Sequence, residues 1–326
     1  MRKFSPLVKW RSLVLRLLEK IFILLEPIFS KAGLRVVFHT YERRYEGYAL
    51  KTMPFKVKGG PRIGILIQGP ITHPQFLADA FANYSKIFPE AVVCLSTWEN
   101  EPLVSQFRQI RNLHIVENSR PKNPGVSNLN LQAVSTYEGL SKLEEFGADN
   151  VLKIRSDQAI LNTAALERMQ KRLVTIPPKK FKRILTTDFN SFLFRPYSAN
   201  DQLMYASVDT LKEFWGAYLN RETYGTIDSK DDFAERLLLK SYLGFLGIPF
   251  EGTLRQSLTA YRDLYCFIDN EELDLFWIKG THRTLRSRFA QQVFPSHDTF
   301  VRFSDWLQLQ DSVDIYLDYF SNMENT

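Results

Sequence analysis

The feature that most constrains the fold is an alternation of short apolar segments, rich in β-branched residues, with longer amphipathic ones. Residues 62–68 (RIGILIQ) have a continuous apolar centre and are followed at once by Gly69-Pro70, which is typical of a buried strand that ends in a turn. The same pattern predicts further strands at 91–96, 113–116 and 151–154, and helices at 74–88, 101–111 and 129–146. Ser127 and Asn128 are candidate caps of the last helix. The alternation favours an α/β fold, with a mainly parallel sheet sandwiched by helices.

Beyond residue 157 the alternation is less regular. The sequence predicts a helix at 163–173, strands at 183–187 and 203–206, and a long helix at 231–246 that Asp228 or Ser229 would cap. No internal repeat, low-complexity segment or Gly/Ser linker interrupts this region. We therefore expect one catalytic-type domain over residues 60–326, ending in a basic and aromatic region, with residues 1–59 as an N-terminal amphipathic helix and lead-in segment.

Residues 1–27 combine a basic start with an apolar run, but charged residues such as Lys9, Arg16 and Lys20 interrupt that run. No uninterrupted stretch reaches the ~20 residues that a transmembrane helix needs. On a helical wheel an apolar set gathers on one side and these three cations on the other, which is typical of a helix lying in the interface of an anionic membrane. The apolar set is Leu7, Trp10, Val14, Leu17, Leu18, Ile21 and Leu25. A terminal helix packed on its own domain is the alternative.

Composition narrows the class of protein. The chain has 44% hydrophobic and 24% charged residues, as a globular protein has, and its formal net charge of +6 is mild for 326 residues. The basic residues match no nucleic-acid-binding motif, so we expect no nucleic-acid partner. Two cysteines, Cys94 and Cys266, cannot build a disulfide framework, which favours a reducing, cytosolic compartment. The glycine-rich dinucleotide and phosphate-loop motifs and GxSxG are absent, which argues against dehydrogenases, P-loop ATPases and serine hydrolases.

Polar residues follow the predicted strands directly. The carboxyl ends of parallel strands meet at one edge of a sheet, where ligands of such sheets bind. Gln68-Gly69-Pro70, Thr97-Trp98 and Arg155-Ser156-Asp157 would converge there and offer amides, an indole, a guanidinium and a carboxylate, a set that suits a nucleotide diphosphate. Asp157 could hold Mg²⁺ or Mn²⁺ against the diphosphate. Alternatively, Asp157 pairs with Arg155 or Arg120, or caps a helix.

Taken together, four segments resemble the WavE-type lipopolysaccharide synthesis proteins: Ile67-Gln68-Gly69-Pro70-Ile71, Leu95-Ser96-Thr97-Trp98, Asn130-Leu131-Gln132 with Gly139-Leu140, and Leu152 to Gln158. The resemblance covers about residues 63–246. It implies a GT-A-like glycosyltransferase in which Asn130 and Gln132 join the donor-binding residues. It also implies that Arg155-Ser156-Asp157 corresponds to the metal-binding DxD motif, with Arg155 where the first Asp often stands. Either Asp157 is then the only protein ligand of the metal, or Arg155 neutralises the phosphates without one.

Candidates for the acceptor side lie further along the chain. Asp201, Asp232 and Glu235 are the catalytic candidates, with Asp201 preferred and Glu235 second. Such a carboxylate would deprotonate the attacking sugar hydroxyl in an inverting displacement, or position the acceptor in a retaining one. Asp201 could instead form an Asx-turn, and Asp232 and Glu235 could provide favourable charge at the start of a helix.

These observations predict a peripheral enzyme at the inner, cytoplasmic membrane that moves a sugar from a nucleotide-sugar donor to a lipopolysaccharide, capsule or lipid-linked glycan. A divalent metal, Mn²⁺ or Mg²⁺, is a candidate cofactor, and residues 1–27 would contact the membrane. A sugar-phosphate or nucleotidyl transferase on the same fold is an alternative. So is a non-catalytic scaffold subunit of a polysaccharide synthesis complex.

Overall fold

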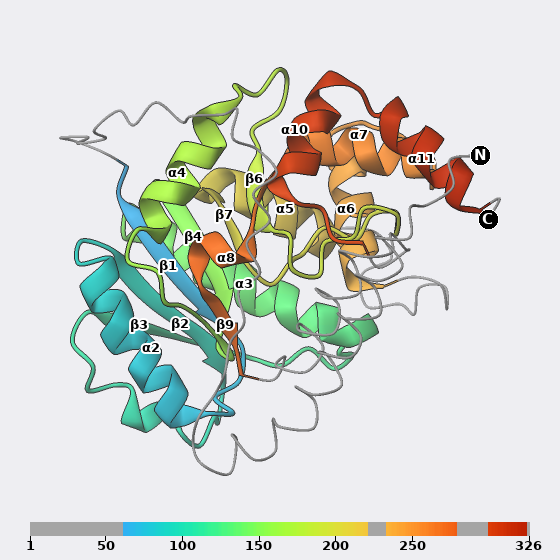
Figure 1. The fold of residues 1–326 in the computed structure, drawn as a ribbon. Helices are drawn as coiled ribbons and strands as arrows, with labels where there is room; N and C mark the ends of the chain where they lie inside the picture. The colour runs from blue at the N-terminus through green and yellow to red at the C-terminus, as the bar shows by residue number, and fades with distance from the viewer. Residues whose placement is uncertain (1–60, 221–232, 279–298, 325–326) are drawn as a thin grey trace, which may run out of the picture. The chain divides into compact units, whose positions relative to one another are not determined.

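The structure is a computed structural model, and it describes residues 61–220, 233–278 and 299–324 (Figure 1). Contacts within the chain divide it into two compact units, one of residues 1–58 and 280–299 and the other of residues 59–279 and 300–326. Nearly all described residues belong to the second unit. The amphipathic helix expected at 1–27 and the candidate caps Asp228 and Ser229 lie outside the described residues, and the expected division of the chain near residue 60 stays a prediction.

The core of the second unit is a seven-stranded sheet with the strand order β3-β2-β1-β4-β7-β6-β8. Only β7 runs against its neighbours β4 and β6, and the other adjacent pairs are parallel. The strands are β1 (Ile63–Gln68), β2 (Val92–Trp98), β3 (Leu113–Asn118), β4 (Asn150–Arg155), β6 (Ile184–Thr187), β7 (Met204–Ser207) and β8 (Tyr265–Ile268). A two-stranded sheet pairs β5 (Gln158–Ile160) with β9 (Leu275–Trp277). The expected α/β fold with a mainly parallel sheet is confirmed.

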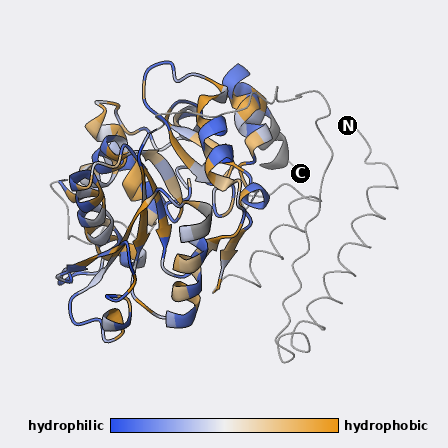
Figure 2. Ribbon diagram, turned by 90° about the vertical axis from the view of Figure 1, so that its left-hand side faces the viewer, coloured by the Kyte–Doolittle hydropathy of each residue, from blue (hydrophilic) through white to orange (hydrophobic). Residues whose placement is uncertain are grey.

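Helices flank the sheet. They are α2 (Pro74–Ile87), α3 (Leu129–Glu145), α4 (Ala165–Thr175), α5 (Val208–Leu219), α6 (Ala234–Phe245), α7 (Leu254–Leu264), α8 (Asn270–Leu273), α10 (Phe303–Asp311) and α11 (Asp314–Glu324). Helix α3 packs on β1 and β2, α5 packs beside α3, and α6 packs beside α5 (Figure 1). The strands are mostly hydrophobic along their length, whereas the helices mix hydrophobic and hydrophilic residues (Figure 2), as expected of strands buried under amphipathic helices.

A glycine allows α3 to lie directly on the sheet. A Cβ atom at Gly139 would come within 2.3 Å of Leu66 Cδ1 and 3.0 Å of the Ser96 Cβ. A side chain there would have to displace Leu66, so glycine favours this close approach of α3 to β1 and β2. The contact matters for the site, because α3 also carries the hydrogen-bond partners of polar residues at the strand ends.

The prediction of a helix at 101–111 is wrong. Only a short 3-10 helix forms there, at Val104–Gln106. The backbone bonds of the segment span three residues, as in the bonds from Gln106 N to Leu103 O and from Ile110 N to Phe107 O. Val104 and Phe107 are buried in the core, and Leu103 and Ile110 pack partly against it. These contacts hold the segment as a series of tight turns instead of an α-helix.

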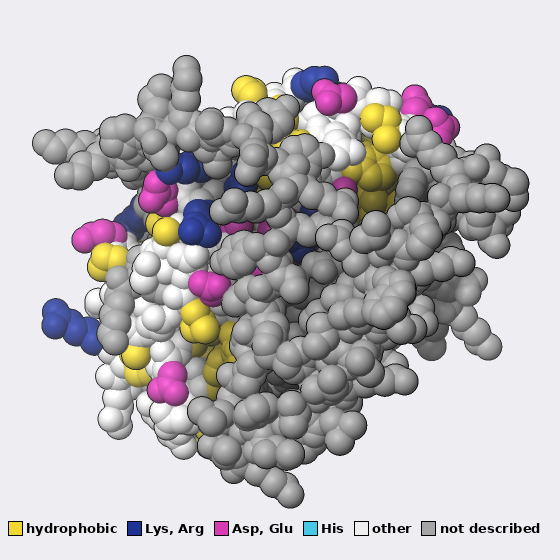
Figure 3. Space-filling model, in the orientation of Figure 1, with side chains coloured by type: hydrophobic (Ala, Val, Ile, Leu, Met, Phe, Trp, Pro, Cys, Tyr) yellow, Lys and Arg dark blue, Asp and Glu magenta, His cyan; other side chains and the backbone are white. Residues whose placement is uncertain are grey.

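The surface gives two further facts. None of the helices in the described part of the chain is both long and apolar enough to cross a bilayer. On the face seen in Figure 3, acidic and basic side chains are interspersed over the described surface.

Candidate functional site

The strand ends meet as the sequence predicts. In the parallel register Gln68 lies opposite both Ser96 and Arg155, and Trp98 lies opposite Asn118. Because β7 is antiparallel, the residues that precede it, 201–203, reach this same edge of the sheet. The edge therefore collects polar residues from β1, β2, β3, β4 and the segment before β7.

The turns after β1 and β4 are locked together. Ser156 Oγ donates to the Pro70 carbonyl oxygen at 2.7 Å, and the Ser156 amide donates to Gln68 O at 2.9 Å. Gly69 has a φ of +126°, and a Cβ atom there would lie 2.9 Å from Ser156 Oγ. Glycine is needed at this position both for its backbone angle and for the close approach of the two turns.

Several predicted donor-binding side chains are engaged within the protein. Gln68 Nε2 donates to Ser135 Oγ of α3 at 2.9 Å. Asn130 Oδ1 accepts from the Tyr218 hydroxyl at 2.6 Å, and its Nδ2 donates to Asn123 O at 3.0 Å. These bonds tie α3 to the sheet, to α5 and to the preceding loop. The Gln68 and Asn130 side chains thus have structural roles, and their contact with a donor stays a prediction.

The remaining predicted donor-binding residues differ in exposure. Trp98 is only 2% exposed, with the Arg120 guanidinium 5.5 Å from its ring centroid, so the indole is covered. Thr97 Oγ1 is buried without a hydrogen-bond partner. Gln132 is partly buried, and Pro70 is exposed. A nucleotide at this edge would first meet Pro70 and Arg120, and it would reach Trp98 only if Arg120 moved.

At the end of β4, Arg155 and Asp157 form a bidentate pair. Arg155 Nε donates to Asp157 Oδ1 and Nη2 donates to Oδ2, both at 2.9 Å. The Asp157 side chain is 2% exposed, whereas that of Arg155 is 26% exposed. Two parallel charge-assisted bonds fix the plane of the guanidinium. The structure therefore has the arrangement that the sequence left as an alternative, in which Asp157 pairs with Arg155.

Asp157 does not fit the role of a metal ligand in this arrangement. Both of its carboxylate oxygens accept hydrogen bonds from Arg155. Within the described ranges, no group of three or more His, Cys, Asp or Glu side chains is placed to hold a metal ion. Mg²⁺ and Mn²⁺ prefer several oxygen ligands. A metal at Asp157 would have to displace Arg155 and take its remaining ligands from elsewhere.

Lys153 lies on the same face of β4 as Arg155, because side chains alternate along a strand. It is completely buried, and its Nζ donates to the main-chain oxygen of Asp201 at 2.6 Å. The ammonium group also lies 4.9 Å from the ring centroid of Trp215. Burial lowers the Lys153 pKa to about 8, and the nearby Asp201 carboxylate opposes that effect. Lys153 thus holds the segment that carries Asp201 against β4.

The two preferred catalytic candidates lie close enough to interact. Asp201 is 4% exposed, and its Oδ2 has no hydrogen-bond partner. The pKa of Glu235, in the first turn of α6, is raised to about 7, first by burial and then by the Asp201 charge, while Arg195 lowers it. A carboxyl group that titrates near neutral pH can accept and release a proton under physiological conditions. The third candidate, Asp232, lies outside the described residues.

Sequence reasoning did not assign roles to Lys153 and Arg195. A lysine inside the otherwise apolar segment VLKI is itself a signal, because a lysine is almost never fully buried without a partner. Arg195 carries no such signal, since its place beside Glu235 depends on how α6 packs.

A second charged cluster lies at the ends of β6 and β8. Arg302 Nη1 lies 3.1 Å from Asp188 Oδ2 and 3.5 Å from Glu271 Oε1, and Nη2 lies 3.4 Å from Asp269 Oδ2. This network joins the start of α10 to the sheet. Its members are far apart in the sequence, so no local pattern predicts it.

A cavity of about 1010 Å³ lies elsewhere, among α3, α5 and α6. Its lining includes Glu144 at the end of α3, Asp209 at the start of α5, and Lys182 before β6. These positions flank the amino ends of the parallel strands, on the side away from Arg155 and Asp201. The buried carboxylates Asp157 and Asp201 lie at the opposite edge, so the candidate site is at the carboxyl ends of the strands.

No protein-family model matches the chain, and no curated protein matches it. Similar solved structures include a cytidylyltransferase from Leptospira borgpetersenii serovar Hardjo-bovis, with 14% identity, a TM-score of 0.40, and coverage of 77% of this chain and 94% of that one. Another is a glycosyltransferase involved in the glycosylation of the major capsid of PBCV-1, with 12% identity, a TM-score of 0.37, and coverage of 71% and 100%.

A third is glucosyl-3-phosphoglycerate synthase from Mycobacterium tuberculosis in complex with UDP, with 14% identity, a TM-score of 0.35, and coverage of 60% and 83%. Similarities this low say nothing about the chain's own reaction. The likeness of its segments to the WavE-type proteins stays a resemblance.

Proposed function

We propose that the protein is a glycosyltransferase that moves a sugar from a nucleotide-sugar donor to a hydroxyl group of a lipopolysaccharide or capsule glycan. The observation that carries this proposal is that Asp201, buried with its Oδ2 unbonded, lies at the same sheet edge as the Arg155–Asp157 pair, and its charge helps to raise the pKa of Glu235. The carboxyl groups offer a proton acceptor, and the Arg155–Asp157 pair presents a cation suited to phosphate. Activation of a hydroxyl beside a phosphate leaving group requires both.

In an inverting displacement the acceptor oxygen attacks the anomeric carbon and forms the new glycosidic bond. The bond from that carbon to the diphosphate oxygen breaks, and the nucleoside diphosphate leaves with the bonding electrons. The hydroxyl proton passes to the Asp201–Glu235 pair. In a retaining mechanism the same carboxylates would position the acceptor. The anomeric configuration of the product distinguishes the two.

The test combines donor binding with transfer. Specific donors raise the melting temperature of the protein by mass action, so UDP-, GDP-, CMP- and dTDP-sugars are screened by thermal shift. The donor that binds is then supplied with membrane glycan extracts, and labelled sugar in the glycan is measured. Asp201→Asn should keep donor binding and reduce transfer about 100-fold or more. Asp311→Asn, on the exposed side of α10, is the matched control and should transfer normally.

The outcomes separate the alternatives. A product linkage that retains phosphorus would replace the glycosyltransferase with a sugar-phosphate transferase. Full transfer by folded Asp201→Asn protein would refute the site. If no nucleotide sugar binds or is consumed, the non-catalytic scaffold becomes the better explanation.

We also propose that the enzyme works at the cytoplasmic side of the inner membrane, held there by residues 1–27. The support is the segregation of apolar and basic residues on opposite sides of a helical wheel of this segment. Co-sedimentation with vesicles that contain anionic lipid should fall when residues 1–27 are deleted and when salt is raised. Equal sedimentation of both forms would contradict membrane attachment through this segment.

A further inference from the structure

The exposures of Arg155 and Asp157 show which group faces outward at the end of β4. The Arg155 side chain is 26% exposed, whereas that of Asp157 is 2% exposed. A ligand arriving at this edge therefore meets the guanidinium group before the carboxylate.

The geometry of the pair determines what the guanidinium can still bind. Asp157 uses Nε and one hydrogen of Nη2. A guanidinium carries further N–H groups in the same plane, and this planar set matches the oxygens of phosphates. Asp157 fixes that plane with two bonds of 2.9 Å, so little side-chain freedom remains to be lost when an anion binds.

The turn after β1 is packed directly against the turn that carries Arg155 and Asp157. Gly69 has no side chain, and Ser156, between the paired residues, directs its hydroxyl toward the Pro70 carbonyl oxygen. The backbone of the β1 turn is thus held close to the β4 turn, which fixes the backbone on which Arg155 and Asp157 are paired.

We infer that Arg155, oriented by Asp157, binds the diphosphate of the donor directly, and that this site needs no divalent metal. In this inference Asp157 is a positioning residue and Arg155 contacts the substrate. The inference rests on the proposed function for the identity of the ligand, but the anion site can be tested without any transfer reaction.

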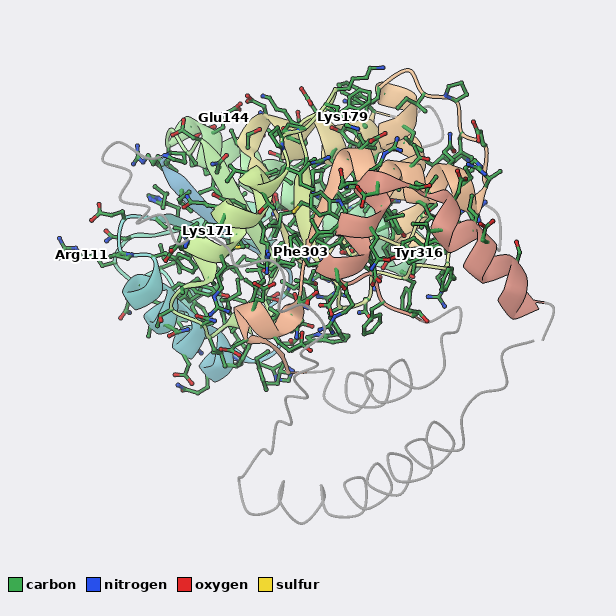
Figure 4. All side chains as sticks on the ribbon, turned by 45° about the horizontal axis from the view of Figure 1, so that its top comes forward. Arg111, Glu144, Lys171, Lys179, Phe303 and Tyr316 are labelled. Atoms are coloured by element: carbon green, nitrogen blue, oxygen red, sulfur yellow. The ribbon has the colours of Figure 1, made fainter. Side chains whose placement is uncertain are left out.

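The experiment uses the full-length protein and two probes, inorganic pyrophosphate and Mn²⁺. Pyrophosphate binding is measured by calorimetry in EDTA for the unchanged protein, Arg155→Gln, Arg155→Lys and Asp157→Asn. Arg111→Gln is the matched control, because it removes the same charge from a side chain at the periphery (Figure 4). Mn²⁺ binding is measured separately by electron paramagnetic resonance, from the loss of the signal of the free ion.

In EDTA, pyrophosphate should bind equally well to the unchanged protein and to Arg111→Gln. Arg155→Gln should weaken binding at least tenfold, and Arg155→Lys should recover it only in part, because an ammonium group lacks the planar fork. Asp157→Asn should weaken binding several-fold, since an amide oxygen can accept only one of the two bonds. Pyrophosphate binding should not require Mn²⁺, and any binding of Mn²⁺ should not depend on Asp157.

Three results would overturn the inference: no pyrophosphate binding in EDTA, binding that Arg155→Gln leaves unchanged, or a Mn²⁺ site that Asp157→Asn removes. Failure here is distinct from failure of the proposed function. Sugar transfer that depends on Mn²⁺ at Asp157 keeps the function and refutes the inference. Pyrophosphate binding at Arg155 without any sugar transfer keeps the inference and refutes the function.

Discussion

Replacing Lys153 with Met should change how the stability of the protein depends on pH. The Lys153 ammonium is fully buried, and burial lowers its pKa to about 8, whereas an unfolded chain would hold it near 10.5. The folded protein therefore releases this proton at a lower pH than the unfolded chain does. The cost of the buried charge is present in full below pH 8 and disappears as the pH rises from 8 toward 10.5.

The size of the effect follows from the two pKa values. A difference of about 2.5 between the folded and unfolded states corresponds to about 3 kcal/mol, of which about 2.5 kcal/mol falls between pH 7 and pH 10. The unchanged protein should thus gain about 2.5 kcal/mol of stability relative to Lys153→Met over that interval. Taking the difference between the two proteins cancels the groups that titrate alike in both.

Urea unfolding at pH 7, 8.5 and 10 measures this difference. Lys142→Met is the control, because Lys142 lies on α3 with a side chain 40% exposed. The difference in unfolding free energy between the unchanged protein and this variant should not change with pH. A flat difference for Lys153→Met as well would mean that the folded protein keeps Lys153 charged throughout. The description of Lys153 as a desolvated cation at the Asp201 segment would then be wrong.

Three further variants test the packing and the site. Gly139→Ala should destabilise the protein by about 1–3 kcal/mol in urea unfolding, because the added methyl group overlaps the sheet. Gly244→Ala is the control: the space around Gly244 is open, so this variant should gain up to about 1 kcal/mol of stability. Equal changes for the two variants would contradict the close approach of α3. Tyr218→Phe should cost about 1–2 kcal/mol in the same measurement, since it leaves Asn130 Oδ1 without its donor. In the transfer assay, a Glu235 base with a pKa near 7 must lose its proton before it can act, so the transfer rate should fall as the pH drops below 7. The Glu235→Gln enzyme should be much slower and should not show this fall.

Much of the first half of the fold could be predicted because its strands are buried on both faces. Such strands read as apolar runs, and the predicted 62–68 and 151–154 correspond to β1 and β4 within one or two residues. Prediction was weaker where packing decides. The strand β8 (YCFI) was not predicted, because a four-residue apolar run after a helix looks the same as the end of that helix.

The place of the candidate residues at the strand ends was predictable from the sequence, but their contacts were not. The rule that ligands bind at the carboxyl ends of strands pointed to Arg155 and Asp157. It could not show that Arg155 occupies both oxygens of Asp157, because residues two apart on a strand end can pair only if the following turn folds back. Nor could it show that Asn130 Oδ1 accepts a hydrogen bond from Tyr218, which lies 88 residues further along the chain.

The direction of β7 explains why Asp201 can take part at all. Residues that precede a parallel strand lie at its amino end, on the far edge of the sheet from Arg155. Because β7 runs antiparallel to β4, the segment before it arrives at the carboxyl edge instead, and Lys153 binds the main chain of Asp201 across 48 residues of sequence. The carboxyl groups that would activate an acceptor and the guanidinium that would bind a donor therefore share one edge because a single strand is reversed.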